Sequence, residues 1–191
     1  MLDEKTKARI IEHLSFEPQL EPDMEPWQND VENDIEWLAF DFINTLDSPE
    51  VYSFLQHLVF KGGGNGGSNP LLRSRAFRAI LNLKDRDPII FLEELLLQPE
   101  SGWRWAACRN LAEHPGSHAI LLLAHTLVHD KDADVRFIAA ESLGIVGDES
   151  GLPALQHAEQ HDSGCDYEGF PIAEAARAAI RAIEERTQRP P

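Results

Sequence analysis

Apolar residues recur along most of the chain at spacings of three and four, which is the pattern of amphipathic helices. No stretch alternates apolar and polar residues as a half-exposed strand would. The pattern therefore predicts an all-α protein. Its stripes predict helices over residues 3–14, 31–46, 49–60, 70–83, 88–97, 101–113, 117–129, 133–146, 150–161 and 171–186.

Prolines mark where several of these helices begin. Pro49, Pro70 and Pro88 each follow a Ser, Asn or Asp, and this order is typical of an N-cap followed by the first helical residue. Two longer connections interrupt the helices, a Gly-rich loop at 61–69 and a polar insertion at 162–169.

A motif repeats in alternate helices. An Arg is followed by mostly small residues three and four positions later and by a bulky apolar residue seven positions later. Copies begin at Arg73, Arg104 and Arg136, and a weaker copy begins at Ala173. Repeats of roughly 20–50 residues with two helices each predict an α-solenoid, in which neighbouring units bury each other's apolar faces.

One unit carries the most specific version of this pattern. Residues 132–148 have Asp before the helix, Val-Arg at its start, Ala-Ala midway, Leu-Gly near its end and Gly-Asp after it. This segment resembles the HEAT-like repeat family, which includes the repeats first described in phycobilin lyases. The resemblance implies stacked antiparallel helix pairs with a concave binding face, in proteins that act as scaffolds, chaperones, inhibitors or adaptors.

The resemblance covers about residues 70–186, and the helices at 31–60 fit as a degenerate first pair. We therefore expect an acidic N-terminal helix and connector over residues 1–30, followed by a HEAT-like repeat domain over 31–191. The expected repeats lie at about 31–60, 70–100, 101–130, 133–161 and 171–186.

Charge is distributed unevenly along the 191 residues, whose net charge is −16. Residues 1–50 hold 14 acidic and 3 basic residues, and residues 111–191 hold 14 acidic and 6 basic, whereas residues 51–110 hold 5 acidic and 8 basic. Nucleic acids and anionic membranes both select cationic proteins, so neither is expected as a partner. The acidity favours a basic partner protein, although it is also compatible with a merely solvated surface.

The sequence also limits where the protein works. Its two cysteines, Cys108 and Cys165, are too few for a disulfide-stapled fold and suit a reducing compartment. Residues 1–14 lack the apolar core of a signal peptide, and no stretch approaches the ~18 apolar residues of a membrane helix. We expect a cytoplasmic protein.

Two clusters are candidates for contact with the partner. The first is acidic and lies in the N-terminal connector. The second surrounds the sequence Trp103-Arg104-Trp105, where successive helical residues point in different directions, so at least one Trp should be exposed or cover an edge. Trp and Arg are favoured at binding hot spots. The candidate residues are Glu21, Asp23, Glu25, Asp30, Arg75, Trp103 and Arg104.

The repeated arginines have two interpretations. In HEAT-like repeats the matching Arg commonly binds an acidic residue of a neighbouring turn, which would make Arg73, Arg104 and Arg136 structural. The alternative is an arginine ladder that binds a carboxylate-bearing partner. Similarly, Arg73, Arg75 and Arg78 follow the Gly-rich loop and could hold an anion, but the loop lacks the Gly-Lys-Ser/Thr ending of a phosphate-binding loop.

Metal binding and catalysis have weaker support. His157 and His161 share a helix face and Cys165 follows, a combination that could bind zinc but is common on polar helices. His125 and His129 form a similar pair. The chain has no His-Glu dipeptide of the kind used by HEAT-like di-iron hydroxylases, and it has no nucleophile elbow or zinc-protease motif. We predict no catalytic residues, no metal and no cofactor.

Together these features favour a non-enzymatic protein–protein interaction module. It would be a scaffold, an adaptor or an inhibitor, the last including immunity-type proteins that mask a cationic toxin by charge complementarity. We expect the second helix of each pair to line the binding face. The alternative is a lyase-like chaperone or enzyme that acts on a bound small molecule or pigment.

Overall fold

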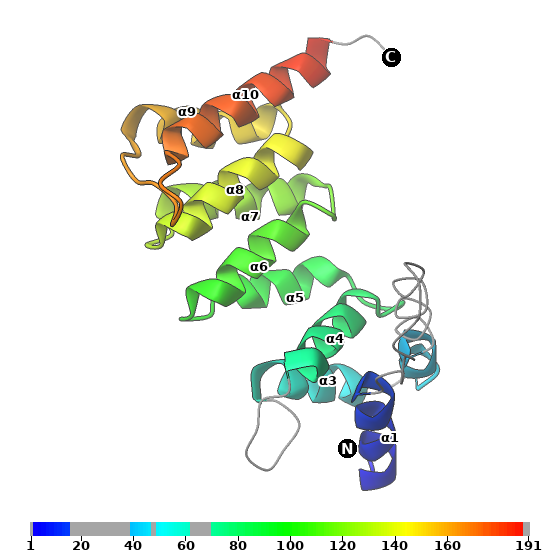
Figure 1. The fold of residues 1–191 in the computed structure, drawn as a ribbon. Coiled ribbons are helices and arrows are strands. Elements are labelled where there is room, and N and C mark those ends of the chain that lie inside the picture. Colours follow the sequence, from blue (N-terminus) through cyan, green and yellow to red (C-terminus); the bar gives the residue numbers. More distant parts are fainter. Residues whose placement is uncertain (1, 16–38, 47–48, 62–69, 189–191) are drawn as a thin grey trace, which may run out of the picture. The chain divides into compact units, whose positions relative to one another are not determined.

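The computed structural model describes residues 2–15, 39–46, 49–61 and 70–188 (Figure 1). In these ranges the regular structure is helical, apart from one isolated bridge between Cys165 and Pro171. The predicted all-α class is confirmed. The chain divides into two compact units, Met1–Pro88 and Ile89–Pro191.

The N-terminal unit contains α1 (Glu4–Ser15), a helical segment at 39–44, α3 (Pro49–Lys61) and α4 (Pro70–Leu81). The predicted starts at Pro49 and Pro70 are confirmed. Helices α3 and α4 pack together, and α1 packs against α4. The apolar face of α1 is buried within this unit, where Ile10 and Leu14 have no exposed surface.

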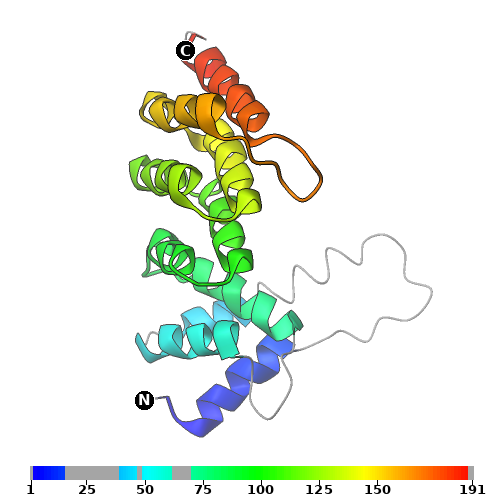
Figure 2. The same ribbon diagram turned by 90° about the vertical axis from the view of Figure 1, so that its left-hand side faces the viewer.

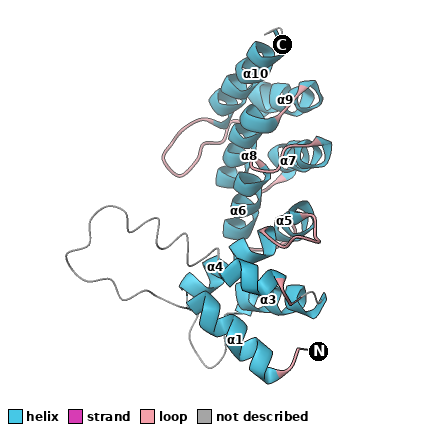
Figure 3. Cartoon of the chain, turned by 90° about the vertical axis from the view of Figure 1, so that its right-hand side faces the viewer, coloured by secondary structure: helices cyan, strands magenta, loops and turns pink. Residues whose placement is uncertain are grey.

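The C-terminal unit holds the regular repeats. In Figures 2 and 3, α6, α8 and α10 stack in one layer and α5, α7 and α9 in the other. A short 3-10 turn at Glu149–Gly151 precedes α9. The predicted helix pairs of an α-solenoid are confirmed, with α10 as a single closing helix. The helices are α5 (Pro88–Leu96), α6 (Ser101–Leu111), α7 (Ser117–His129), α8 (Ala133–Val146), α9 (Leu152–His161) and α10 (Ile172–Gln188).

The small residues of the repeated motif are fully buried. Ala107 and Cys108 on α6 and Ala139 and Ala140 on α8 have no exposed surface. Beside them, a Cβ added at Gly144 would lie 3.2 Å from the Cα and Cβ of Ala179 on α10. The missing side chain at Gly144 therefore lets α8 and α10, neighbours within one layer, approach closely.

The polar insertion before α10 is an ordered loop. Asp166 Oδ1 accepts hydrogen bonds from the backbone N–H groups of Glu168 (3.0 Å) and Phe170 (2.8 Å). Gly169 has φ +91°, a conformation that favours glycine. The Tyr167 N–H donates to Asp134 Oδ1 on α8 at 2.7 Å. These bonds fix the loop beside the layer of α8 and α10, from which it projects in Figures 2 and 3.

None of the helices in the described part of the chain is long and apolar enough to cross a membrane.

Candidate functional site

The Arg104 guanidinium joins consecutive repeats. Its Nε and Nη2 donate to the two carboxylate oxygens of Asp130, at 2.7 and 3.0 Å. Its Nη1 donates to the carbonyls of Gln98 and Pro99, at 2.9 and 2.8 Å. Both side chains are buried, with 6% and 8% exposed. A bidentate pair of this kind is both strong and geometrically specific.

Arg136 repeats the same arrangement one unit later. Its Nε and Nη2 donate to Asp162 at 2.7 and 3.2 Å, and its Nη1 donates to the Asp130 carbonyl at 3.0 Å. In both cases the acceptor lies 26 positions after the arginine, directly after the second helix of the pair. We call these two pairs the ladder. The structural interpretation of Arg104 and Arg136 is therefore confirmed.

The ladder shifts the titration of its aspartates. Burial alone would raise the pKa of Asp130, but hydrogen bonds from Arg104 and from the Asp132 N–H, with the charges of Arg104 and Arg136, hold its pKa below the usual range. Burial would also raise the pKa of Asp162, but the hydrogen bonds from Arg136 and from the Gly164 N–H outweigh burial, so this pKa is lowered as well. Both aspartates are charged whenever the fold is intact near neutral pH.

The neighbouring thiol is inert. Burial, and secondarily the charge of Asp130, raises the pKa of the Cys108 thiol to about 12. At neutral pH, a thiol with such a pKa is almost entirely protonated, and the protonated form is not the nucleophile.

The arginines of the N-terminal unit make different contacts. Arg73 Nε donates to the Val59 carbonyl at 2.8 Å, near the end of α3. Arg75 is 4% exposed, and its Nη1 donates to the Leu14 carbonyl at 3.2 Å, at the end of α1. A cation at a helix C-terminus stabilises the terminal carbonyls.

Three of the seven predicted contact residues lie in the described part of the chain. Arg75 and Arg104 are buried and bind within their own units, so they are unsuited to the surface contact we expected. Trp103 is partly exposed. The acidic candidates Glu21, Asp23, Glu25 and Asp30 lie outside the described residues and remain predictions.

A groove of about 690 Å³ crosses the layer of α6, α8 and α10. Its apolar lining includes Phe137, Ile145, Ala178 and Ala182, with Phe170 from the loop. This groove lies over the first helices of the pairs, and the loop before α10 supplies one of its walls. That the second helices line the binding face stays a prediction.

A second hollow of about 380 Å³ adjoins the groove at the loop, and we call it the aromatic pocket. The two share Arg109, Phe137, Ile138, Glu141 and Phe170 in their linings. The groove and the pocket together are called the groove face. Six carboxylates and one arginine line the groove face: Glu113, Asp134, Glu141, Asp166, Glu168, Glu174 and Arg109.

The groove face follows a register that the sequence contains. Each helix presents a row of residues at i, i+4 and i+8, and such residues lie on one helix face. The first residue of each row comes directly after the first position of the repeated motif. The rows are Trp105 and Arg109 on α6 with Glu113 in the turn just after it, Phe137, Glu141 and Ile145 on α8, and Glu174, Ala178 and Ala182 on α10.

Glu141 sits at the centre of this arrangement. Loss of hydration within the groove raises the pKa of its carboxyl, the negative charge of Asp166 raises it further, and Arg109 opposes the shift. A cation placed beside Glu141 would relieve both effects. The groove face therefore combines an apolar floor with carboxylates that are only partly compensated.

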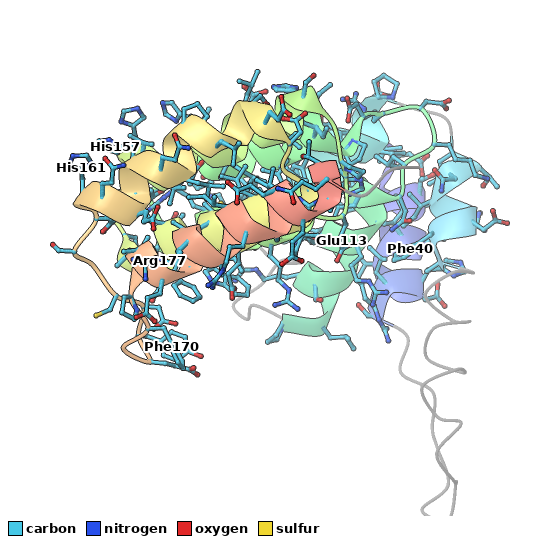
Figure 4. The ribbon with its side chains drawn as sticks, turned by 90° about the horizontal axis from the view of Figure 1, so that it is seen from above. Phe40, Glu113, His157, His161, Phe170 and Arg177 are labelled. Carbon is cyan, nitrogen blue, oxygen red and sulfur yellow. The ribbon has the colours of Figure 1, made fainter. Side chains whose placement is uncertain are left out.

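The histidines lie on a different face of the unit. In Figure 4, His157 and His161 project from α9, away from Phe170 on the loop. Their rings stack at 4.7 Å, and His161 Nδ1 lies 3.1 Å from the His157 carbonyl. Among the described residues, no three His, Cys, Asp or Glu side chains gather in a metal-binding arrangement.

Comparison with known proteins identifies the repeat. Residues 99–166 match the family model of HEAT repeats, without distinguishing the phycobilin-lyase type. Comparisons with curated proteins and with solved structures gave no match. The matched segment begins where the carbonyls of Gln98 and Pro99 bind Arg104, and it includes both ladder pairs. HEAT repeats commonly serve as scaffolds for protein–protein interactions, and this segment of the chain is similar to them.

Proposed function

We propose that this protein is a non-enzymatic interaction module that holds a basic segment of a partner protein on the groove face. The observation that carries the proposal is the composition of that face, in which one arginine accompanies six carboxylates around an apolar floor. Protein interfaces commonly combine an apolar centre with a polar rim. The charge excess selects partners with Lys and Arg around an apolar anchor.

The overall acidity supports the same proposal at longer range. A net charge of −16 attracts basic proteins and accelerates their association, most strongly at low salt. A partner could be held for assembly, as by a scaffold or adaptor, or masked, as by an inhibitor. An immunity-type inhibitor of a cationic toxin is one form of the second role.

The dimensions of the groove support one alternative. Small-molecule sites usually measure about 300–1,000 Å³ and are largely apolar, and the groove of about 690 Å³ lies within that range. A lyase-like chaperone or enzyme would hold a small molecule or pigment there. An absorbance spectrum and mass spectrometry of the purified protein test this alternative, because a retained chromophore or ligand would favour it.

The proposal is tested by capturing basic proteins from host lysate on three immobilised forms of the protein. The groove variant carries Glu113→Lys and Glu141→Lys. The matched control carries Glu149→Lys and Glu185→Lys, which change two exposed residues outside the lining of the groove face and add the same charge. Hydrogen exchange verifies that all three forms are folded.

We expect the wild type and the control to retain the same basic proteins at low salt, and the groove variant to bind them at least about tenfold more weakly, since like charges at an interface are strongly unfavourable. Higher salt should weaken the contact of the wild type. Equal retention by the groove variant and the control would overturn the proposal.

A further inference from the structure

The aromatic pocket contains two kinds of group that bind organic cations. Its carboxylates come from Asp134, Glu141, Asp166 and Glu168. Aromatic ring faces attract cations, and Arg is the side chain most often found on them. The pocket's aromatic residues are Trp105 on α6, Phe137 on α8 and Tyr167 and Phe170 on the loop.

One guanidinium already lies at this wall. Arg109 Cζ is 5.6 Å from the ring centroid of Trp105, which is within cation–π distance. That single positive charge faces four carboxylates, so the pocket keeps an excess of negative charge. The Trp105 side of the pocket therefore already holds one guanidinium, and the remaining negative charge of the carboxylates can balance a second one.

Internal bonds hold the pocket in shape. Asp134 receives the Tyr167 N–H, and Asp166 receives the Phe170 N–H, each on its Oδ1 atom. Tyr167 Oη donates to Glu168 Oε1 at 2.9 Å. A carboxylate offers about four acceptor positions, so these bonds leave acceptor capacity for a ligand. Because the loop is fixed beforehand, little order has to be gained on binding.

The two loop aromatics remain accessible despite this order. Tyr167 is 81% exposed and Phe170 is 55% exposed. Large aromatic side chains that are held in place yet left in water are typical contact residues, since covering them removes apolar surface from water.

We infer that the aromatic pocket binds the side chain of one arginine of the partner, stacked against the aromatic rings and bonded to the surrounding carboxylates. This inference rests on the proposed function and names the residue type that the groove face recognises. Arginine is favoured over lysine because its planar guanidinium can stack on a ring and still bind a carboxylate with two N–H groups.

The test uses L-argininamide, L-lysinamide and L-glutaminamide as probes in NMR titrations of the full-length protein. The readout is the indole N–H of Trp105, assigned with the variant Trp105→Phe, together with the backbone amides of residues 165–170. The pocket variant carries Tyr167→Ala and Phe170→Ala. The control is Leu121→Ala, which removes another exposed apolar side chain (62% exposed) on α7.

We expect L-argininamide to give saturable shifts at these positions, L-lysinamide to bind several-fold more weakly and L-glutaminamide not to bind. The pocket variant should weaken L-argininamide binding at least about tenfold, whereas Leu121→Ala should leave it unchanged. Absence of saturable shifts, equal binding of the arginine and lysine probes, or an undiminished affinity of the pocket variant would overturn the inference.

These outcomes separate the inference from the proposed function. If basic proteins depend on the groove carboxylates but L-argininamide does not bind, the arginine pocket is wrong and the proposed function stands. If L-argininamide binds in the pocket but the groove variant retains basic lysate proteins as well as the control does, the pocket stands and the proposed function fails.

Discussion

Arginines at the same repeat position behave differently in the two units. In the C-terminal unit, Arg104 and Arg136 each bind an aspartate 26 positions later. In the N-terminal unit, Arg73 instead binds the Val59 carbonyl, and position 99, which is 26 positions after it, holds a proline. The pairing of the repeated arginine with the aspartate that follows the next helix is thus a feature of the C-terminal unit, since position 99 is a proline.

Within the C-terminal unit, stability and the proposed partner binding involve different residues. The ladder and the small residues face inward and hold the repeats together, whereas the residues one position later face outward and form the groove face. The match to HEAT repeats covers the ladder segment, residues 99–166, and leaves out the N-terminal unit. Four predictions test the contrast between the two units.

The largest effect is expected from Arg104→Ala. Removing one partner of a buried ion pair costs about 3–5 kcal/mol, because the other charge is left buried without compensation. The comparison in the N-terminal unit is Lys84→Ala, which removes an exposed ion pair with Asp41 and should cost less than about 1 kcal/mol. Urea-dependent hydrogen exchange, followed by mass spectrometry of peptides from each unit, measures both. Equal losses in the two units would contradict the contrast.

Arg136→Ala is expected to have a smaller effect than Arg104→Ala. Its side chain and that of Asp162 are 17% and 14% exposed, so water partly solvates the charge that remains. A loss of about 1.5–3 kcal/mol is expected, as for a hydrogen bond to a charged group. The same exchange experiment on residues 133–161 measures it, and a loss larger than that of Arg104→Ala would be inconsistent with the burial of the two pairs.

The third effect in size is the loss of stability that acid causes by protonating the ladder aspartates. The lowered pKa values of Asp130 and Asp162 add stability that is fully present above the aspartate's ordinary pKa of 3.8 and is lost as the pH falls through the lowered values. Each unit of pKa difference corresponds to about 1.4 kcal/mol.

The control for this acid effect is the double variant Asp130→Asn and Asp162→Asn. It should be less stable at pH 7 and should lose less further stability below pH 4 than the wild type. Unfolding by urea at a series of pH values between about 2 and 7 tests this, and parallel curves for the two proteins would refute the assignment.

The smallest effect concerns the two thiols. Cys165 is exposed and should react quickly with a thiol reagent, whereas Cys108 is buried with its pKa raised to about 12 and should react only when the unit opens. Arg104→Ala should accelerate labelling of Cys108 but not of Cys165. Mass spectrometry of labelled peptides measures the two rates, and rapid labelling of Cys108 in the wild type would contradict its burial.

Helix periodicity and the repeated motif were sufficient to predict the helices of the C-terminal unit. The starts at Pro49, Pro70, Pro88 and Ser101 are also as predicted, because Pro and N-cap residues act locally. The packing of α1 against α4 could not be predicted, since a short amphipathic stripe does not identify the surface that covers it.

The candidate site was predicted less well. Residue type favours Trp103 and Arg104 as contact residues, whereas in the structure Trp105 lines the aromatic pocket and Arg104 belongs to the ladder. The informative signal was the row one position after each arginine, where Trp105 and Phe137 are both aromatic. That row could have been found by applying the repeat register to outward-facing positions. The loop aromatics Tyr167 and Phe170 lie outside the register, so only the folded structure connects them to the site.

The most direct test of the groove face as a binding surface is hydrogen exchange of the protein with and without a captured basic partner. We predict that binding slows exchange in residues 133–145 and 165–178, which belong to α8, the loop and α10, and leaves α7 and α9 unchanged. Slower exchange confined to α7 and α9, with none on α8, the loop or α10, would contradict the groove face as the site of partner binding.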